Sequence, residues 1–300
     1  MLILRRVWAT SRLAGSSGHP SCTGVGCQTL KLHLHEWGDP SAPPLVCLHG
    51  VTSHGGRFRR LGAHLGKRFH VLAPDLRGHG RSGWEPPWSV ATHLADVLES
   101  TGVERATWLG HSFGGRLVAE LAAAEPDRVS RAVLLDPALQ VLPHVAFDMA
   151  ELERKDASFA SVEEAVQLRY DSGRVLIAPR ELLVEDETDH LEPGPDGLLR
   201  YRYCKSAVVT AWSVMADTPP TPARVPTLIV LGERSWLFLD GQVEAYRAAL
   251  GDLVEVVTVP GGHTVMWDAL DATEEALDRF LGPPGKGDRS RSATQTDARA

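Results

Sequence analysis

The letters GHSFG at residues 110–114 place a serine between glycines, a pattern that suits the hydroxyl of Ser112 to nucleophilic chemistry. An apolar run at 107–109 precedes the pattern, and an alanine-rich stretch follows it. A serine presented at a sharp strand-to-helix turn has a strained backbone, so Gly110 and Gly114, two positions away on either side, must lack bulk. We therefore predict that Ser112 is a nucleophile. The alternative is a glycine-rich turn that serves only packing.

A serine hydroxyl needs a base to attack at neutral pH, and the usual base is an imidazole. The chain has 13 histidines, of which His263 is the best placed. It ends a Gly-Gly-His run directly after the apolar run 254–259, so it would lie on a loop at the same sheet edge as Ser112. His33 and His35 alternate on one face of an expected early strand and lack a third ligand, so we expect surface residues there rather than a metal site.

Attack on a carbonyl creates negative charge on its oxygen, which preorganised N–H groups must stabilise. We expect one N–H from Phe113, next to the nucleophile, and the other from Val51, in the loop after the apolar run 45–48. His49 and Gly50 begin that loop and could form an ordinary turn. A glycine directly after a strand, however, is what close approach of backbone to substrate requires, and this favours the functional interpretation.

Short apolar runs alternate with helical stretches along the chain, and they occupy residues 44–48, 70–73, 107–109, 131–135, 227–231 and 254–259. Strands of this kind are buried on both faces, and strands that alternate with helices form a parallel sheet with right-handed crossovers. The sequence therefore predicts an α/β fold. Helices are expected at 115–124, stopped by Pro126, and at 241–250, stopped by Gly251.

The alternation of strand and helix fails at residues 137–222, where charged helical stretches replace it. Ser161 and Glu164 form a capping box that would open a helix through Tyr170, and Pro179 suits the first turn of another helix. We predict a helical cap inserted at the carboxyl edge of the sheet. Such an insertion shapes a pocket and excludes water, so substrate preference should depend on it.

An acidic cluster lies inside the predicted cap and comprises Glu185, Asp186, Glu187 and Asp189. It could bind a cation, but a solvated helix end or loop is the favoured interpretation, and we assign it no role.

The domain organisation follows from these patterns. Residues 29–136 and 223–281 would form the core and 137–222 the cap, whereas 282–300 lack large apolar side chains and are expected to be disordered. Residues 1–28 are rich in arginine and serine and have no acid. This composition fits an organelle transit peptide, but a disordered extension on a cytoplasmic protein is favoured.

Composition excludes several classes of protein. The 300 residues are 43% hydrophobic, which is enough for a sizeable core. The net charge of -7 and the scattered basic residues exclude a nucleic-acid partner. No apolar stretch reaches the roughly 20 residues that a spanning helix needs, so we expect no stable membrane insertion. The four cysteines suggest no disulfide framework, and Cys47 would be a buried thiol in a reducing compartment such as the cytoplasm.

From about residue 29 to 281 the chain resembles the α/β-hydrolase superfamily. The shared marks are His49-Gly50, the segment DLRGHGRS at 75–82, the serine turn and Gly262-His263. The resemblance implies a mostly parallel sheet flanked by helices, a serine nucleophile, and a histidine that comes last in the chain. It implies no cofactor and no metal. In relatives the segment at 75–82 braces the wall of the active site, so Asp75 is expected to be structural.

The sequence departs from the family pattern at the acid of the triad. Relatives commonly carry Asp three residues after the glycine that closes the strand at 227–231, but the residues after Gly232 read Glu-Arg-Ser-Trp. Some relatives place the acid after the preceding strand, where this chain has Asp136. A triad is defined by geometry and not by position, so Asp136 is the first candidate, ahead of Asp240 and Glu233. The alternative role for Asp136 is that of a turn acid before proline.

These residues predict hydrolysis of a small carboxylic ester or related acyl substrate through an acyl-enzyme. Serine at the turn argues against epoxide or haloalkane hydrolysis, for which similar proteins use a carboxylate nucleophile. Hydrolysis of a carbon–carbon bond in a β-diketone-like substrate is the first alternative, and assays with both substrates would separate the two. A binding protein without turnover is the second, favoured by the missing acid, and a fluorophosphonate probe would leave its serine unlabelled. No pattern indicates an oligomeric state.

Overall fold

A seven-stranded sheet forms the centre of the computed structural model, which describes residues 29–173, 177–237 and 241–282. Its order is β1-β3-β2-β4-β5-β8-β9, and β1 alone runs antiparallel to its neighbour. The strands are β1 (Leu34–Trp37), β2 (Pro44–Leu48), β3 (His70–Pro74), β4 (Ala106–His111), β5 (Val129–Leu135), β8 (Thr227–Gly232) and β9 (Val254–Val259). Strand β4 extends beyond the predicted 107–109 because Gly110 and His111 continue its pairing with Leu134 and Leu135 of β5.

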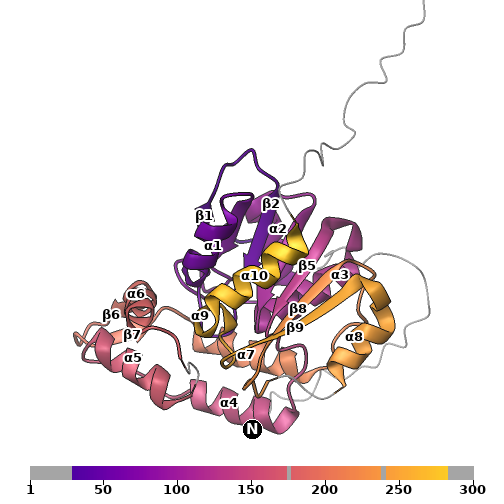
Figure 1. Ribbon diagram of the computed structural model, residues 1–300. Coiled ribbons are helices and arrows are strands. Elements are labelled where there is room, and N and C mark those ends of the chain that lie inside the picture. The colour runs from indigo at the N-terminus through magenta and orange to yellow at the C-terminus, as the bar shows by residue number, and fades with distance from the viewer. Residues whose placement is uncertain (1–28, 174–176, 238–240, 283–300) are drawn as a thin grey trace, which may run out of the picture.

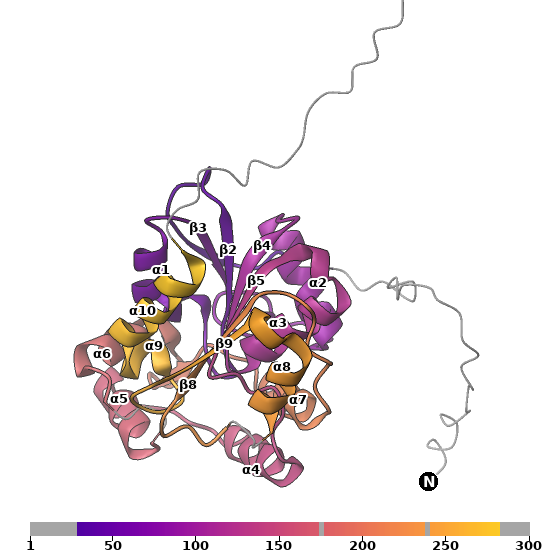
Figure 2. The ribbon, with the colours of Figure 1, turned by 45° about the vertical axis from the view of Figure 1, so that its right-hand side comes forward.

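Helices cover both faces of the sheet, as Figure 2 shows. One face carries α1 (Arg59–Leu65) and α10 (Leu270–Leu281), and the other carries α2 (Val90–Thr101), α3 (Phe113–Ala124) and α8 (Gln242–Leu250). Successive residues of a strand point to opposite faces. In β2, accordingly, Leu45 and Cys47 join the first apolar layer, while Val46 and Leu48 join the second. The predicted α/β arrangement is confirmed.

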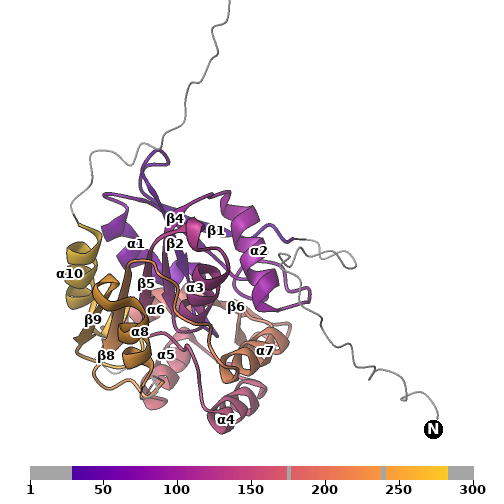
Figure 3. The same cartoon turned by 90° about the vertical axis from the view of Figure 1, so that its right-hand side faces the viewer.

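Residues 137–222, the expected cap and from here on the cap segment, leave the sheet after β5 and return to it at β8. The segment contains α4 (Pro143–Glu153), α5 (Val162–Asp171), α6 (Arg180–His190), α7 (Lys205–Ala216) and an antiparallel hairpin of β6 (Leu191–Pro193) and β7 (Leu199–Tyr201). Its elements gather along one side of the core (Figures 1 and 3). The sequence pattern did not predict the hairpin, because each strand has only three residues.

The predicted capping box opens α5. The Ser161 hydroxyl accepts the N–H of Glu164 at 3.3 Å, and the Glu164 carboxylate accepts the N–H of Ala160 at 2.7 Å. Pro179 directly precedes α6. The expectation that the acidic cluster on α6 is solvated is wrong for Asp186 and Glu187, which are 4% and 0% exposed. Both lie on the helix face that is turned away from solvent, and both pair with buried arginines there.

Several predictions concern residues outside the described ranges. These are the extension at 1–28, the tail from residue 283 onward, and the acid candidate Asp240. Cys47 is a free, buried thiol, as predicted, and burial raises its pKa. Within the described ranges, none of the helices is both long and apolar enough to cross a membrane.

Candidate active site

Ser112 occupies the turn between β4 and α3 with φ 55° and ψ -120°. A non-glycine residue in this positive-φ region is strained, and surrounding structure must hold it there. The Ser112 N–H donates to the Leu135 carbonyl at 3.2 Å, and the Ser112 carbonyl accepts the N–H of Ala138 at 3.1 Å. The end of the neighbouring strand β5 therefore holds the serine in the conformation that the sequence pattern predicted.

The glycines around Ser112 permit close backbone contacts. A Cβ on Gly114 would lie 2.0 Å from the Leu48 carbonyl oxygen, and one on Gly110 would lie 2.2 Å from the Gly114 carbonyl oxygen. Any side chain at either position would therefore displace the turn or strand β2. This is the physical reason for the glycine spacing.

Asp136 and His263, which are far apart in the sequence, are in direct contact. His263 Nδ1 lies 2.6 Å from Asp136 Oδ2. Asp136 directly follows β5, has φ 39° and is 1% exposed. Glu233 is exposed and makes no hydrogen bond to His263 within the described part of the chain. Of the acid candidates that can be compared, Asp136 is the one beside the imidazole.

Ser235 explains how the missing acid is accommodated. It stands three residues after Gly232, where relatives commonly carry Asp, and its hydroxyl donates to Asp136 Oδ2 at 2.5 Å. The N–H of Gly232 donates to Asp136 Oδ1 at 2.9 Å. The loop after β8 thus contributes donors that fix the Asp136 carboxylate in place of a carboxylate of its own. Sequence reasoning missed Ser235, although its offset from the closing glycine was a usable signal.

His111 supports the loop that carries His263. The two imidazole rings lie 4.6 Å apart between centroids, and His111 Nε2 donates to the backbone carbonyl of His263 at 3.0 Å. Burial lowers the pKa of His111 well below its usual value, so the ring is neutral. Ser112 and His263, both in the described part, are not hydrogen-bonded to each other in this state. Catalytic contacts of this kind often tighten only when substrate binds.

The loop after β2 lies against Ser112. A Cβ on Gly50 would lie 3.0 Å from Ser112 Cβ and 3.4 Å from Ser112 Oγ. His49 fixes this loop, because its Nδ1 donates to the Gly50 carbonyl at 2.8 Å and its Nε2 accepts the N–H of Leu76 at 2.9 Å. Val51 follows and is buried. The structure therefore brings the predicted oxyanion loop to the nucleophile candidate.

Asp75 has structural contacts, as the resemblance implied. Its Oδ1 accepts His35 Nε2 at 3.1 Å and the N–H of Gly55 at 2.7 Å, and its Oδ2 accepts the N–H of Arg81 at 2.8 Å. His35 is therefore partly buried and hydrogen-bonded, which the expectation of a plain surface residue did not include. Burial raises the pKa of Asp75, but the hydrogen bonds and the charge of neighbouring His35 outweigh it and leave the pKa below its usual value.

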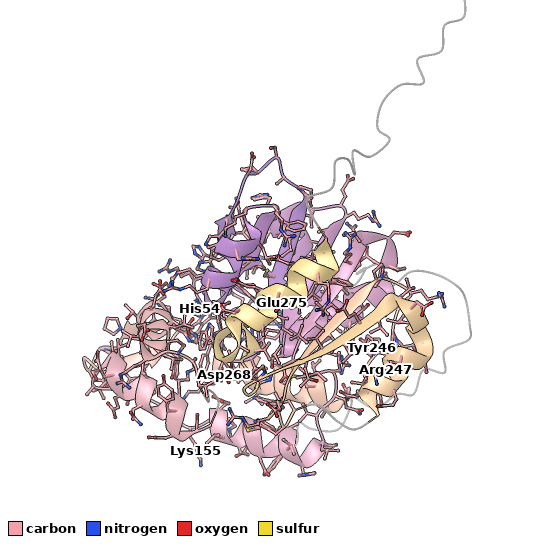
Figure 4. All side chains as sticks on the ribbon, in the orientation of Figure 1. His54, Lys155, Tyr246, Arg247, Asp268 and Glu275 are labelled. Carbon is pink, nitrogen blue, oxygen red and sulfur yellow. The ribbon has the colours of Figure 1, made fainter. Side chains whose placement is uncertain are left out.

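Asp268 joins the loop of His263 to the cap segment. Its Oδ2 accepts the N–H of Gly262 at 2.8 Å, while its Oδ1 accepts the N–H groups of Ile177 and Ala178, each at 3.0 Å. It ends the short helix α9 (Val265–Asp268), and Figure 4 shows it between α9 and the cap segment. We infer that Asp268 positions the loop, because its carboxylate accepts from both sides at once.

Asp268→Asn is expected to break one side of this bridge, because an amide has one acceptor oxygen and its NH₂ would face a second donor. The free energy of unfolding should fall by about 1–3 kcal/mol, the usual cost of leaving buried donors unpaired. Urea denaturation would measure the change. Asp271→Asn, an exposed acid at the start of α10, is the matched control and should change stability little. Equal stability of Asp268→Asn and the control would contradict the bridge.

Buried neutral histidines lie behind the oxyanion loop. His79 packs edge-on against His49 at 5.1 Å, and His93 packs against Phe113 at 5.7 Å. Burial lowers the pKa of His79 to about 4 and that of His93 to about 3, from 6.5. The unfolded chain therefore binds these protons more readily than the folded chain does. The two histidines should therefore contribute fully to the free energy of unfolding above pH 6.5. Their contribution should fall as the pH drops towards the lowered pKa values.

We expect the free energy of unfolding to decrease by roughly 1.4 kcal/mol per pH unit for each such histidine below pH 6.5. Urea denaturation between pH 7.5 and about 4.5 would test this, since buried carboxylates such as Asp75 lose their contribution only at lower pH. His93→Leu removes one titrating group and should make the pH dependence less steep than in the wild type. A stability that stays constant from pH 7 to pH 5 would contradict the prediction.

Comparisons with known proteins agree with this architecture. Residues 43–162 match the family model described as alpha/beta hydrolase fold. The chain is 34% identical over 265 residues to lipase LipV of Mycobacterium tuberculosis, a match that covers 85% of this chain and 99% of that protein. It is 29% identical over 282 residues to the 2-(acetamidomethylene)succinate hydrolase of Mesorhizobium japonicum, covering 89% and 97% of the two chains.

A crystal structure of an E-2-(acetamidomethylene)succinate hydrolase is also similar in fold. It aligns with a TM-score of 0.73 at 26% identity and covers 84% of this chain and 95% of the other. Fold, relatives and family model all indicate one class of enzyme. The chain belongs to the α/β-hydrolase family, as the resemblance implied.

Proposed function

We propose that this protein is a serine hydrolase that cleaves a small carboxylic ester or related acyl substrate, with Ser112 as nucleophile, His263 as base and Asp136 as acid. The observation that carries the proposal is the 2.6 Å contact between His263 Nδ1 and Asp136 Oδ2. This contact fixes the His263 ring, so Nε2 is the nitrogen available to accept the proton of the Ser112 hydroxyl. The strained turn of Ser112 lies at the end of the adjacent strand.

In the proposed reaction His263 Nε2 removes the proton of the Ser112 hydroxyl while its oxygen attacks the substrate carbonyl. The imidazolium that forms is stabilised by the buried Asp136 carboxylate, which keeps its own charge. His263 then protonates the leaving alcohol as the tetrahedral intermediate collapses, and an acyl-enzyme on Ser112 remains. Water, activated by the same imidazole, attacks the acyl group and releases the acid and free Ser112.

The oxyanion of each tetrahedral intermediate would be bound by the backbone N–H groups of Phe113 and Val51. Phe113 begins α3, and N–H groups in the first turn of a helix have no partner within the helix. Val51 directly follows Gly50, whose backbone is so close to the serine that a Cβ on Gly50 would lie 3.4 Å from Ser112 Oγ. Donors held in advance at this point stabilise the developing charge without reorganisation.

The relatives favour acyl chemistry. One is named a lipase and another a hydrolase of 2-(acetamidomethylene)succinate. The alternative of a binding protein without turnover depended on the absent acid in the loop after β8. Asp136 in contact with His263, with Ser235 in the place of the usual acid, supports an enzyme instead.

A fluorophosphonate probe tests the proposal directly, because an activated serine is labelled quickly and an ordinary one is not. We expect one label per chain, carried by Ser112, and competition by short p-nitrophenyl esters. Ser112→Ala should remain unlabelled, whereas Ser130→Ala, a serine on β5, should be labelled as the wild type is. A folded wild-type protein without labelling would contradict the proposal. Turnover of a β-diketone in preference to esters would favour carbon–carbon hydrolysis.

A further inference from the structure

Three buried side chains from the core and the cap segment converge beside α6. Asp186 and His190 lie on α6, four residues apart, so they project from the same helix face. His54 directly precedes the short helix η1 (Gly55–Phe58), three residues after Val51. His54 Nε2 lies 3.1 Å from Asp186 Oδ1, and one ligand atom from each of the three residues lies within 4.8 Å of the other two. Figure 4 shows His54 at the border between the core and the cap segment.

The imidazole of His190 is buried, and its nitrogens are free to bind a ligand. Neither of its ring nitrogens has a hydrogen-bond partner among the described residues, and the side chain is 0% exposed. Its ring stacks on that of His54 at 4.7 Å and packs against Tyr201 at 5.1 Å. Buried polar atoms in proteins are nearly always paired, and within the described chain His190 has both ring nitrogens unpaired beside two other ligating groups, so they are open to a bound species.

We propose that His54, Asp186 and His190 bind a divalent first-row transition-metal ion such as Zn²⁺, and that this ion fastens α6 of the cap segment to the loop that follows Val51. Two imidazoles and one carboxylate are a donor set that Zn²⁺ and its neighbours prefer. Ca²⁺ and Mg²⁺ prefer sites built of oxygen, so they are not the expected ions.

The geometry requires little rearrangement. Ligands at about 2.1 Å from a tetrahedral zinc ion lie roughly 3.4 Å apart. The 3.1 Å between His54 Nε2 and Asp186 Oδ1 is close to that separation. The ligand atoms lie up to 4.8 Å apart, so the most distant pair must approach by roughly 1.4 Å, which small χ rotations provide. His54 would release the proton that it now shares with the carboxylate, because a ligating nitrogen must be deprotonated.

Arg57 orients the carboxylate for this role. Its Nη2 donates to Asp186 Oδ2 at 3.0 Å, so Oδ1 is the oxygen that faces His54. The Arg57 guanidinium itself lies over the Trp267 ring at 4.7 Å, in the helix that follows His263. A side chain that is hydrogen-bonded to a metal ligand, as Arg57 is to Asp186, holds that ligand in orientation and strongly influences the affinity for the metal.

The charges nearby can accommodate a cation. Arg57 is paired with Asp186, and Arg169 is paired with Glu187 at 2.6 Å. Asp75 adds a negative charge, since it accepts the N–H of the residue directly after His54. These groups carry one excess negative charge, which a divalent ion would change to one positive charge.

The other group of potential ligands, His33, His35 and Asp75, fits less well. Both oxygens of Asp75 already accept N–H bonds, from His35, Gly55 and Arg81. Within the described residues His33 makes no hydrogen bond, ion pair or ring contact with His54, Asp186 or His190, so it provides a matched control.

The test uses the full chain, stripped with a chelator and dialysed. Titration with Co²⁺ should give the visible absorption of a low-coordinate ion and saturate at one ion per chain, and Zn²⁺ should displace it. Calorimetry with Zn²⁺ should give a dissociation constant of about 1 µM or lower. The thermal midpoint should rise with Zn²⁺ and return to its starting value with chelator, since a ligand that binds only the folded state stabilises it.

His190→Phe keeps the ring and removes both nitrogens, so it should weaken binding at least about a hundredfold. His33→Ala should bind as the wild type does. If His190→Phe does not fold, as judged by circular dichroism, His54→Gln replaces it. Absence of saturable binding by the wild type overturns the proposal, as does unchanged binding by the variants or loss of binding in His33→Ala. No substrate is used, so these outcomes are independent of the serine-hydrolase proposal.

Discussion

Replacement of Ser112 by Ala, or of His263 by Ala, is expected to reduce ester hydrolysis at least several hundredfold, because nucleophile and base act as one unit. The double variant should lose about as much as either single one, for the same reason. Initial rates with short p-nitrophenyl esters, corrected for uncatalysed hydrolysis, would measure the loss. Neither side chain belongs to the apolar layers, so the protein should still fold.

Two controls isolate the effect. His144→Ala changes an exposed histidine on α4, and Ser130→Ala changes a serine on β5, and both should retain activity close to that of the wild type. Thermal melting of every variant separates lost chemistry from lost structure. Full activity in folded Ser112→Ala or His263→Ala would rule out the proposed mechanism.

Asp136→Asn is expected to lower the turnover number by roughly a hundredfold or more. The amide keeps the size of the side chain but has no charge to stabilise the imidazolium. It also replaces Oδ2, which now accepts from both His263 and Ser235, or Oδ1, which accepts the N–H of Gly232. An NH₂ group on either side faces a donor, so the tautomer and orientation of His263 would be disturbed.

Parallel variants distinguish Asp136 from the other acid candidates. Glu233→Gln and Asp240→Asn should each cost less than about tenfold, a change of about 1.4 kcal/mol in the barrier. Ser235→Ala removes one donor to the carboxylate and should cost less than Asp136→Asn does. If Asp136→Asn keeps near-native turnover while Glu233→Gln or Asp240→Asn loses most of its turnover, the acid lies after β8 instead. Full activity of all these variants would indicate a Ser-His dyad.

A double variant tests whether geometry alone defines the acid. Asp136→Ser should be nearly inactive, and adding Ser235→Asp should restore part of the turnover. The two side-chain oxygens are 2.5 Å apart, so a carboxylate on Ser235's backbone position can approach His263 Nδ1. A second double variant combines Asp136→Ala with Ser235→Asp. If turnover recovers with serine at position 136 but not with alanine there, a hydroxyl at position 136 is needed as well.

Local sequence determined the elements and most of the candidate site. The strand-turn-helix around Ser112 could be predicted because its requirements are confined to neighbouring residues: an apolar strand, two glycines and a helix former. The placement of His263 followed from one further rule, that parallel strands end at the same edge of a sheet. The α/β fold followed from alternation, since apolar runs of this length must be buried on both faces.

Tertiary structure alone decided which groups complete the site. Asp136 and Ser235 are 99 residues apart, and Asp268 meets the cap segment across 90 residues, so no local pattern records either contact. The short β6-β7 hairpin and the burial of Asp186 and Glu187 escaped prediction for a related reason. Acidic residues on a helix favour solvent unless a partner elsewhere in the chain compensates their burial, and the sequence of the helix does not identify Arg57 or Arg169 as that partner.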